Sequence, residues 1–126
     1  MTENEISKIV LDAAFEIHRE PGPGLLESVY EAIMEYELIH TYGLKVSRQQ
    51  GIPVVWKGIK LDLGFRFDLI VEEKVIVELK SVENLPLVYP KQVLTHLRLT
   101  NQKLGMLINF NVVLLKDGIK RIVNNL

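Results

Sequence analysis

The chain has 126 residues, of which 48% are apolar and 25% charged, and its formal net charge is −1. This length and balance predict a single soluble domain over residues 1–126, without a general attraction to nucleic acid. The absence of cysteine excludes disulfides, thiolate zinc sites and a cysteine nucleophile. Together with the lack of a secretory or membrane-spanning segment, it favours the cytoplasm.

Two N-terminal segments carry apolar residues at helical spacing. Residues 3–19 predict a helix with one apolar face. The Pro-Gly corner at 20–24 ends this helix. A second helix is expected from Pro23 or Leu25 to Tyr42, with Gly43 as its stop. We expect its inward face to hold Leu26, Val29, Tyr30, Ile33 and Tyr36.

The middle of the chain alternates apolar and polar residues, which predicts β-strands. Residues 44–60 indicate a hairpin that turns at Lys57-Gly58, and Pro53 is typical of an edge strand or a bulge. Residues 64–71 and 75–80 indicate a second hairpin. We expect the segments between 52 and 80 to form a three-stranded antiparallel meander.

The loop length of the second hairpin decides which side chains share a face. A two-residue loop at Glu72-Glu73 would bury Ile70 and Arg66. A three-residue loop pairs Val71 with Val75, hence Asp68 with Glu78, and places Lys80 opposite Arg66. It also gathers one apolar stripe on the other face: Phe65, Phe67, Leu69, Val71, Val75, Val77 and Leu79.

Two facing carboxylates repel each other unless a cation lies between them. Mg²⁺ prefers such oxygen ligands and completes its shell with water and substrate phosphate. The alternative is an ordinary surface hairpin in which Glu78 and Lys80 form a weak ion pair. The position of Glu78 within the apolar run VIVELK favours a site.

The C-terminal third predicts a helix from Pro90 to about Thr100, followed by two strands. Gln92 and His96 lie four residues apart on one side of this helix, where an ordinary polar flank is the alternative. Basic residues cluster mildly nearby, at Lys91, Arg98 and Lys103. Residues 103–110 form an apolar run typical of a strand covered on both faces, and 119–123 returns after a turn at Asp117-Gly118.

Two motifs resemble a known group of enzymes. The pattern FD…ELK, with Asp68, Glu78 and Lys80, is similar to the signature of the PD-(D/E)xK nucleases. Phe67 takes the place of the usual proline. The segment GLLESVY at 24–30 matches the GxxExxY motif of one bacterial and archaeal family assigned to that superfamily. The similarity covers most of the chain and implies an α/β fold, with a restriction-endonuclease-like αβββαβ core, an extra N-terminal helix and an extra C-terminal strand.

The resemblance also implies roles for individual residues. Asp68 and Glu78 would bind Mg²⁺ or, in its place, Mn²⁺, and Glu27 from the preceding helix would join the metal or its water shell. Lys80 would orient or activate the attacking water. Substrate contacts would come from Tyr30 and from Gln92 with His96, which stands where some relatives have tyrosine.

Three functions are compatible with these residues. The first is a metal-dependent phosphodiesterase acting on nucleic acid, with DNA favoured over RNA. The second is a binding or regulatory module that keeps the nuclease fold without turnover. In the third, the charged cluster is structural and Lys80 pairs with Glu78 or Asp68. A homodimer, formed through residues 52–56 or the C-terminal strands, would let a small nuclease reach both strands of a duplex.

Overall fold

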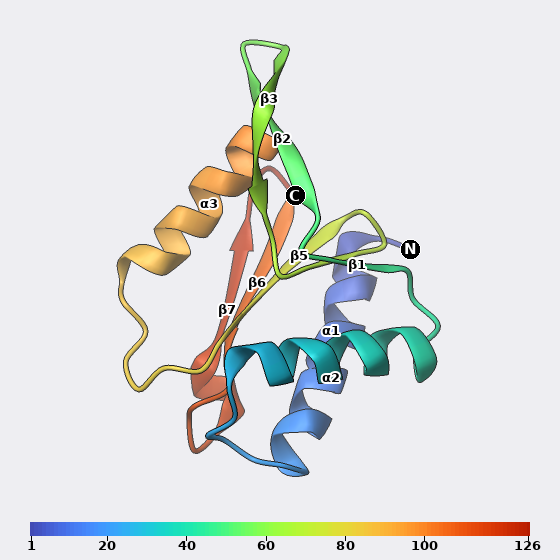
Figure 1. Ribbon diagram of the computed structural model, residues 1–126, viewed down its shortest axis with the longest axis vertical. Helices are drawn as coiled ribbons and strands as arrows, with labels where there is room; N and C mark the ends of the chain where they lie inside the picture. Colours follow the sequence, from blue (N-terminus) through green and yellow to red (C-terminus); the bar gives the residue numbers. More distant parts are fainter.

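A computed structural model describes residues 1–62 and 64–126, and in it helices cover both faces of a five-stranded sheet (Figure 1). Helices α1 (Glu3–Arg19) and α2 (Glu27–His40) pack on one face, and α3 (Val88–Thr100) packs on the other. The sheet has the order β1-β4-β5-β6-β7. Its strands are β1 (Val46–Arg48), β4 (Leu69–Val71), β5 (Val75–Lys80), β6 (Leu104–Asn109) and β7 (Ile119–Val123). Strands β5 and β6 are parallel and the other neighbours are antiparallel, so the predicted mixed α/β fold is confirmed.

The first helix forms where the sequence predicts it. Thr2 caps α1 by accepting from the Glu5 N–H, and the Glu5 carboxylate accepts from the Thr2 N–H in return. This capping box satisfies two donors that an uncapped helix start would leave unpaired. The buried face of α1 consists of Ile6, Val10, Ala13, Ala14 and Ile17 together with the small Ser7.

The predicted inward face of α2 was confirmed for Tyr30 and in part for Ile33, but it was wrong for the other three residues. Leu26, Val29 and Tyr36 are exposed. The buried residues are Tyr30, Glu31, Met34 and Leu38, and Ile33 is partly buried. A carboxylate on the core side was not expected from the apolar spacing, because an unpaired buried charge is costly. It is tolerated here because Glu31 pairs with Arg48 of β1.

The register of the β4–β5 hairpin follows the prediction. Val71 pairs with Val75 and Leu69 with Val77, which requires the three-residue loop. Within that loop Glu72 and Glu73 have φ values of 53° and 58°, and the Lys74 N–H donates to the Val71 carbonyl. The next pair in this register is Asp68 with Glu78.

The predicted meander was wrong, because the strand expected over 64–71 breaks at Phe67-Asp68. Its first part belongs to β3 (Ile59–Arg66), which pairs with β2 (Gly51–Trp56) in a separate two-stranded sheet. Strand β1 therefore lies next to β4. Hydrogen bonds to distant parts of the chain stabilise the break: the N–H of Asp68 donates to the Glu78 side chain, and the Asp68 carbonyl accepts from the Gln49 N–H.

The break also divides the predicted apolar stripe between two faces. Leu69, Val71, Val75, Val77 and Leu79 face α1 and α2, whereas Phe65 and Phe67 pack on the α3 side with Ile76 and Leu107. Arg66 does not lie opposite Lys80; it donates to the Gln49 carbonyl. Gly64 is required in β3, because a Cβ there would lie 2.1 Å from the Ile52 carbonyl oxygen.

The C-terminal strands agree with the sequence. All six residues of β6 are buried, as expected for a strand covered on both faces. Gly105 lets α3 approach, since a Cβ there would lie 2.9 Å from Val93 Cγ1. A short 3₁₀ turn, η1 (Leu115–Gly118), leads into β7.

Candidate active site

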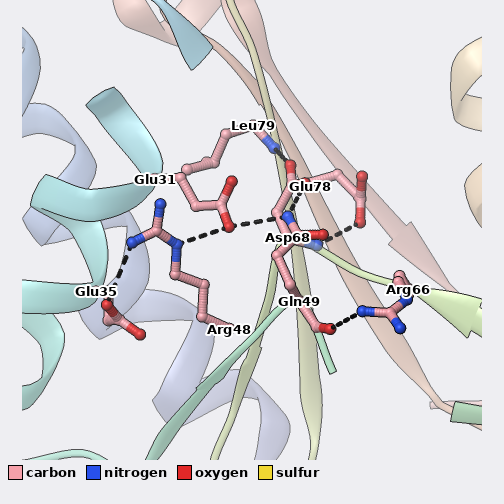
Figure 2. A network of polar contacts seen from close by, with 8 residues as sticks. All are labelled: Glu31, Glu35, Arg48, Gln49, Arg66, Asp68, Glu78 and Leu79. Carbon is pink, nitrogen blue, oxygen red and sulfur yellow. Dashed lines mark hydrogen bonds and ion pairs between the residues drawn. The ribbon is translucent and has the colours of Figure 1, made fainter. Parts of the chain in front are cut away.

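Asp68 and Glu78 hold each other in place where the β4–β5 hairpin begins (Figure 2). The Asp68 N–H donates to Glu78 Oε1 over 3.0 Å. In the other direction, the Leu79 N–H donates to Asp68 Oδ2 over 2.8 Å. Each carboxylate thus accepts a main-chain hydrogen bond from the opposite strand, which fixes the two acids side by side.

Both carboxyl groups resist ionisation. Burial, followed by the negative charge of Asp68, raises the pKa of Glu78 to about 7. Burial is also the main reason why the pKa of Asp68 is raised, and the charge of Glu31 adds to it. Lys80 opposes both shifts. The pair therefore fits a hard divalent cation, which accepts carboxylate oxygens and would offset the repulsion between them.

Lys80 faces a cavity between β5 and α3. The cavity has a volume of about 200 Å³ and is lined by Glu78, Lys80, Tyr89, Gln92, Val93, His96 and Leu107. The Lys80 ammonium lies 5.0 Å from the centroid of the Tyr89 ring, a cation–π contact. Among the described residues Lys80 forms no ion pair. Its charge is therefore available to the cavity.

The structure brings Gln92 and His96 to the cavity with Glu78 and Lys80. The imidazole of His96 stacks on Phe65, with the ring centroids 3.9 Å apart. Burial lowers the pKa of His96, which favours the neutral ring at pH 7. His96 therefore offers the cavity a hydrogen-bonding and stacking group that adds no charge.

The segment 24–30 joins α2 to the end of β5. Glu27 is the first residue of α2, and its Oε2 accepts from the Ser81 N–H over 3.3 Å. The Ser81 hydroxyl donates to the Leu25 carbonyl. Glu27 is thereby tied to the residue that follows Lys80, but in the described part of the chain no three His, Cys, Asp or Glu side chains converge to hold a metal.

Tyr30 lies in the core. Its hydroxyl donates to the Gly22 carbonyl over 2.6 Å and accepts from the Leu25 N–H, and its ring stacks on Phe110 at 4.3 Å. With none of its surface exposed, Tyr30 fixes the Pro-Gly corner. Contact with a substrate would require the ring to leave the core.

Comparison with known proteins identifies the family. The model of the PD-(D/E)XK nuclease superfamily matches residues 4–122. The chain belongs to this superfamily. No curated protein and no solved structure matches the chain. The mixed sheet with helices on both faces agrees with the restriction-endonuclease-like fold of these nucleases. The described helices include none long and apolar enough to cross a membrane.

A polar network next to Asp68 and Glu78 was not predicted from the sequence (Figure 2). Arg48 Nε donates to Glu31 Oε1 over 3.0 Å, and Arg48 Nη1 lies 3.6 Å from Glu35 Oε1. Gln49 Nε2 donates to Glu31 Oε1 at 2.9 Å and to Asp68 Oδ1 at 3.3 Å. This amide connects α2 to the Asp68 carboxylate.

A weak signal for this network existed in the sequence. Glu31 lies one helical turn after Glu27, so the two carboxylates share one side of α2. The sequence held no signal for the role of Gln49, because its φ of 54° and its place beside Asp68 arise from the break between β3 and β4.

Proposed function

We propose that the chain is a metal-dependent phosphodiesterase of the GxxExxY family that cleaves nucleic acid in the cytoplasm, with DNA favoured over RNA. Gly24, Glu27 and Tyr30 support the family assignment. Asp68 and Glu78 would hold Mg²⁺ or Mn²⁺. The observation that carries the proposal is this hydrogen-bonded acid pair, whose raised pKa values make a cation the natural partner.

Each residue of the site would have a separate task. A bound divalent ion would supply positive charge to the oxygens of the phosphate. Lys80, which points into the cavity, would bind a phosphate oxygen and orient the attacking water. Glu27 would support the site from α2, and Gln92 and His96 would contact the substrate from α3.

The direct test is Asp68→Ala, assayed on labelled DNA and RNA oligonucleotides with Mg²⁺ or Mn²⁺. We expect a loss of cleavage on the order of 10²-fold or more, because the variant lacks one of the two acids. Asp12→Ala is the matched control, since Asp12 is an exposed acid on α1, on the opposite side of the sheet from the cavity. Equal cleavage by Asp68→Ala and the wild type would refute the assignment.

A catalytically silent binding module is the second candidate. It is favoured by the geometry around the acid pair, because among the described residues no three His, Cys, Asp or Glu side chains converge to hold a metal. Calorimetry with Mg²⁺ and Mn²⁺, with and without oligonucleotide, separates the two functions. The nuclease should take up metal, whereas no uptake in either titration would favour the binding module.

A further inference from the structure

The net charge of −1 hides a strong separation of charge along the chain. Residues 1–40, which form α1 and α2, contain nine Asp or Glu and two Lys or Arg, a net charge of −7. Residues 84–103, which include α3, contain three basic residues and no acid. Residues 51–66 contain three basic residues and only Asp62 as an acid. Together the α3 segment and the β2–β3 hairpin therefore carry a net charge of +5.

The β2–β3 hairpin projects beyond the five-stranded sheet (Figure 1). Its base is fixed to α3, because Ile52 and Phe65 pack against the apolar cluster under that helix and Phe65 stacks on His96. Its tip is open. Trp56 is 57% exposed and Ile59 63% exposed, and the Lys57 ammonium lies 5.9 Å from the centroid of the Trp56 indole.

The hairpin is continuous with the proposed active site. His96 contacts Phe65 at the base of the hairpin and also lines the cavity that holds Glu78 and Lys80. The hairpin, α3 and the cavity thus lie on the same side of the sheet, opposite the acidic helices α1 and α2.

We propose that the β2–β3 hairpin and α3 form one nucleic-acid-binding surface, in which Trp56 stacks on a base while Lys57 and Lys60 bind phosphates of the strand whose scissile bond lies at the cavity. An exposed indole beside lysines has the chemistry of a single-strand platform, since the ring accepts any base and the ammonium groups bind the backbone. A solvated tryptophan with apolar neighbours also indicates a surface that is covered in use. The inference rests on the proposed function and specifies its substrate as a strand with unpaired bases.

The length of the hairpin predicts how long the bound nucleic-acid strand must be. Phe65 lies six positions after Ile59, which corresponds to roughly 20 Å of β-strand at about 3.3 Å per residue. Stacked nucleotides at about 3.4 Å each would need roughly six units to cover that distance. Affinity should therefore rise until the strand extends about six nucleotides beyond the cavity, and then level off.

The experiment measures binding separately from cleavage. The assay uses the Asp68→Ala variant as the parent, because we expect it not to hydrolyse the oligonucleotide. Fluorescence anisotropy then measures the binding of labelled oligonucleotides of increasing length. Adding Trp56→Ala should weaken binding of a 12-nucleotide single strand about 10-fold, and Trp56→Phe should restore most of the loss. Lys57→Gln with Lys60→Gln should reduce the slope of log K against log salt by about 1.4. Lys8→Gln, on the acidic α1 side, is the control and should bind like the parent.

Three outcomes would overturn the proposal. The first is that the Trp56 and lysine variants bind as tightly as the parent. The second is an equal effect of Trp56→Ala on a blunt duplex and on the single strand. The third is light scattering that shows a wild-type dimer converted to monomers by Trp56→Ala, which would assign the tip to a second copy of the chain. In each case loss of cleavage by Asp68→Ala would leave the nuclease function intact, whereas the absence of any cleavage or binding by the wild type would remove both.

Discussion

The β2–β3 and β4–β5 hairpins follow one another in this chain, but they differ in how far they are buried. Both are antiparallel and alternate apolar with polar residues. Both turn through two residues with positive φ, Lys57-Gly58 in one and Glu72-Glu73 in the other. Yet β4 and most of β5 are buried, whereas the tip of β2–β3 exposes three large apolar side chains: Trp56, Ile59 and Leu61.

The difference lies in the neighbours of each hairpin. Strand β5 lies in the middle of the sheet between β4 and β6, with helices on both faces. The β2–β3 hairpin is anchored to α3 at its base, through residues such as Phe65. The alternation of apolar and polar residues therefore specifies a strand, and the surrounding elements decide whether that strand is buried in the core or projects from it. The projecting β2–β3 hairpin is called the arm below. Asp68 lies between the two hairpins, so the candidate site forms where the buried β4–β5 hairpin meets the projecting β2–β3 hairpin.

The largest expected contrast compares one substitution in each hairpin. Ile76→Ala removes a side chain with 0% exposure on the α3 side of β5. We expect the free energy of unfolding to fall by about 2–5 kcal/mol, because burial is lost and a cavity remains. Ile59→Ala, at the tip of the arm, should change it by less than about 1 kcal/mol. Urea denaturation measures both values, and similar losses would show that the arm is part of the cooperative core.

The next contrast is the response of the buried hairpin to pH. The folded-state pKa of Glu78, about 7, lies above the ordinary value of 4.5. Its contribution to stability is therefore fully present below pH 4.5 and is lost as the pH rises through 7. Glu78→Gln removes this loss and keeps an oxygen that can accept from the Asp68 N–H. In metal-free protein we expect the variant to be more stable than the wild type by up to about 3 kcal/mol at pH 8.

The pH dependence distinguishes this effect from ordinary repacking. At pH 4.5 the advantage of Glu78→Gln should disappear, since the wild-type carboxyl is then protonated. Asp62→Asn is the matched control on the arm, because it removes an exposed acid and should show no such dependence. A variant whose advantage is equal at pH 4.5 and pH 8 would mean that Glu78 does not resist ionisation in the folded protein.

The sequence predicted what depends on local pattern. The first helix, the buried strand β6 and the Val71–Val75 register follow from spacing and loop length alone. Asp68 and Glu78 could be paired in advance for the same reason. The split of the 64–71 strand could not be predicted, because it depends on hydrogen bonds of Asp68 to residues ten and nineteen positions away.

The polar network of Glu31, Arg48 and Gln49 was the least predictable part of the site. Glu31 is a charge on a core-facing position, and apolar periodicity excludes such a residue unless its partner is known. That partner, Arg48, lies on β1 and reaches Glu31 only after β1 has taken its place beside β4. The face of α2 was misassigned for this reason: without Arg48, the exposed Leu26 and Val29 are better candidates for burial than Glu31.

The smallest expected effect compares the ion pair that joins β1 to α2 with the ion pair at the turn of the buried β4–β5 hairpin. Arg48→Gln would leave the carboxylate of Glu31 buried with Gln49 as its remaining donor. We expect a loss of about 1–2 kcal/mol, below the usual penalty for a broken buried pair because the Arg48 side chain is 36% exposed. Lys45→Gln breaks the pair between Lys45 and Glu73, whose side chains are 64% and 73% exposed, and should leave the free energy of unfolding nearly unchanged. Urea denaturation in low and high salt measures both. Losses that are equal, and equally sensitive to salt, would mean that the Glu31 network is as solvated as the surface turn and does not help to position Asp68.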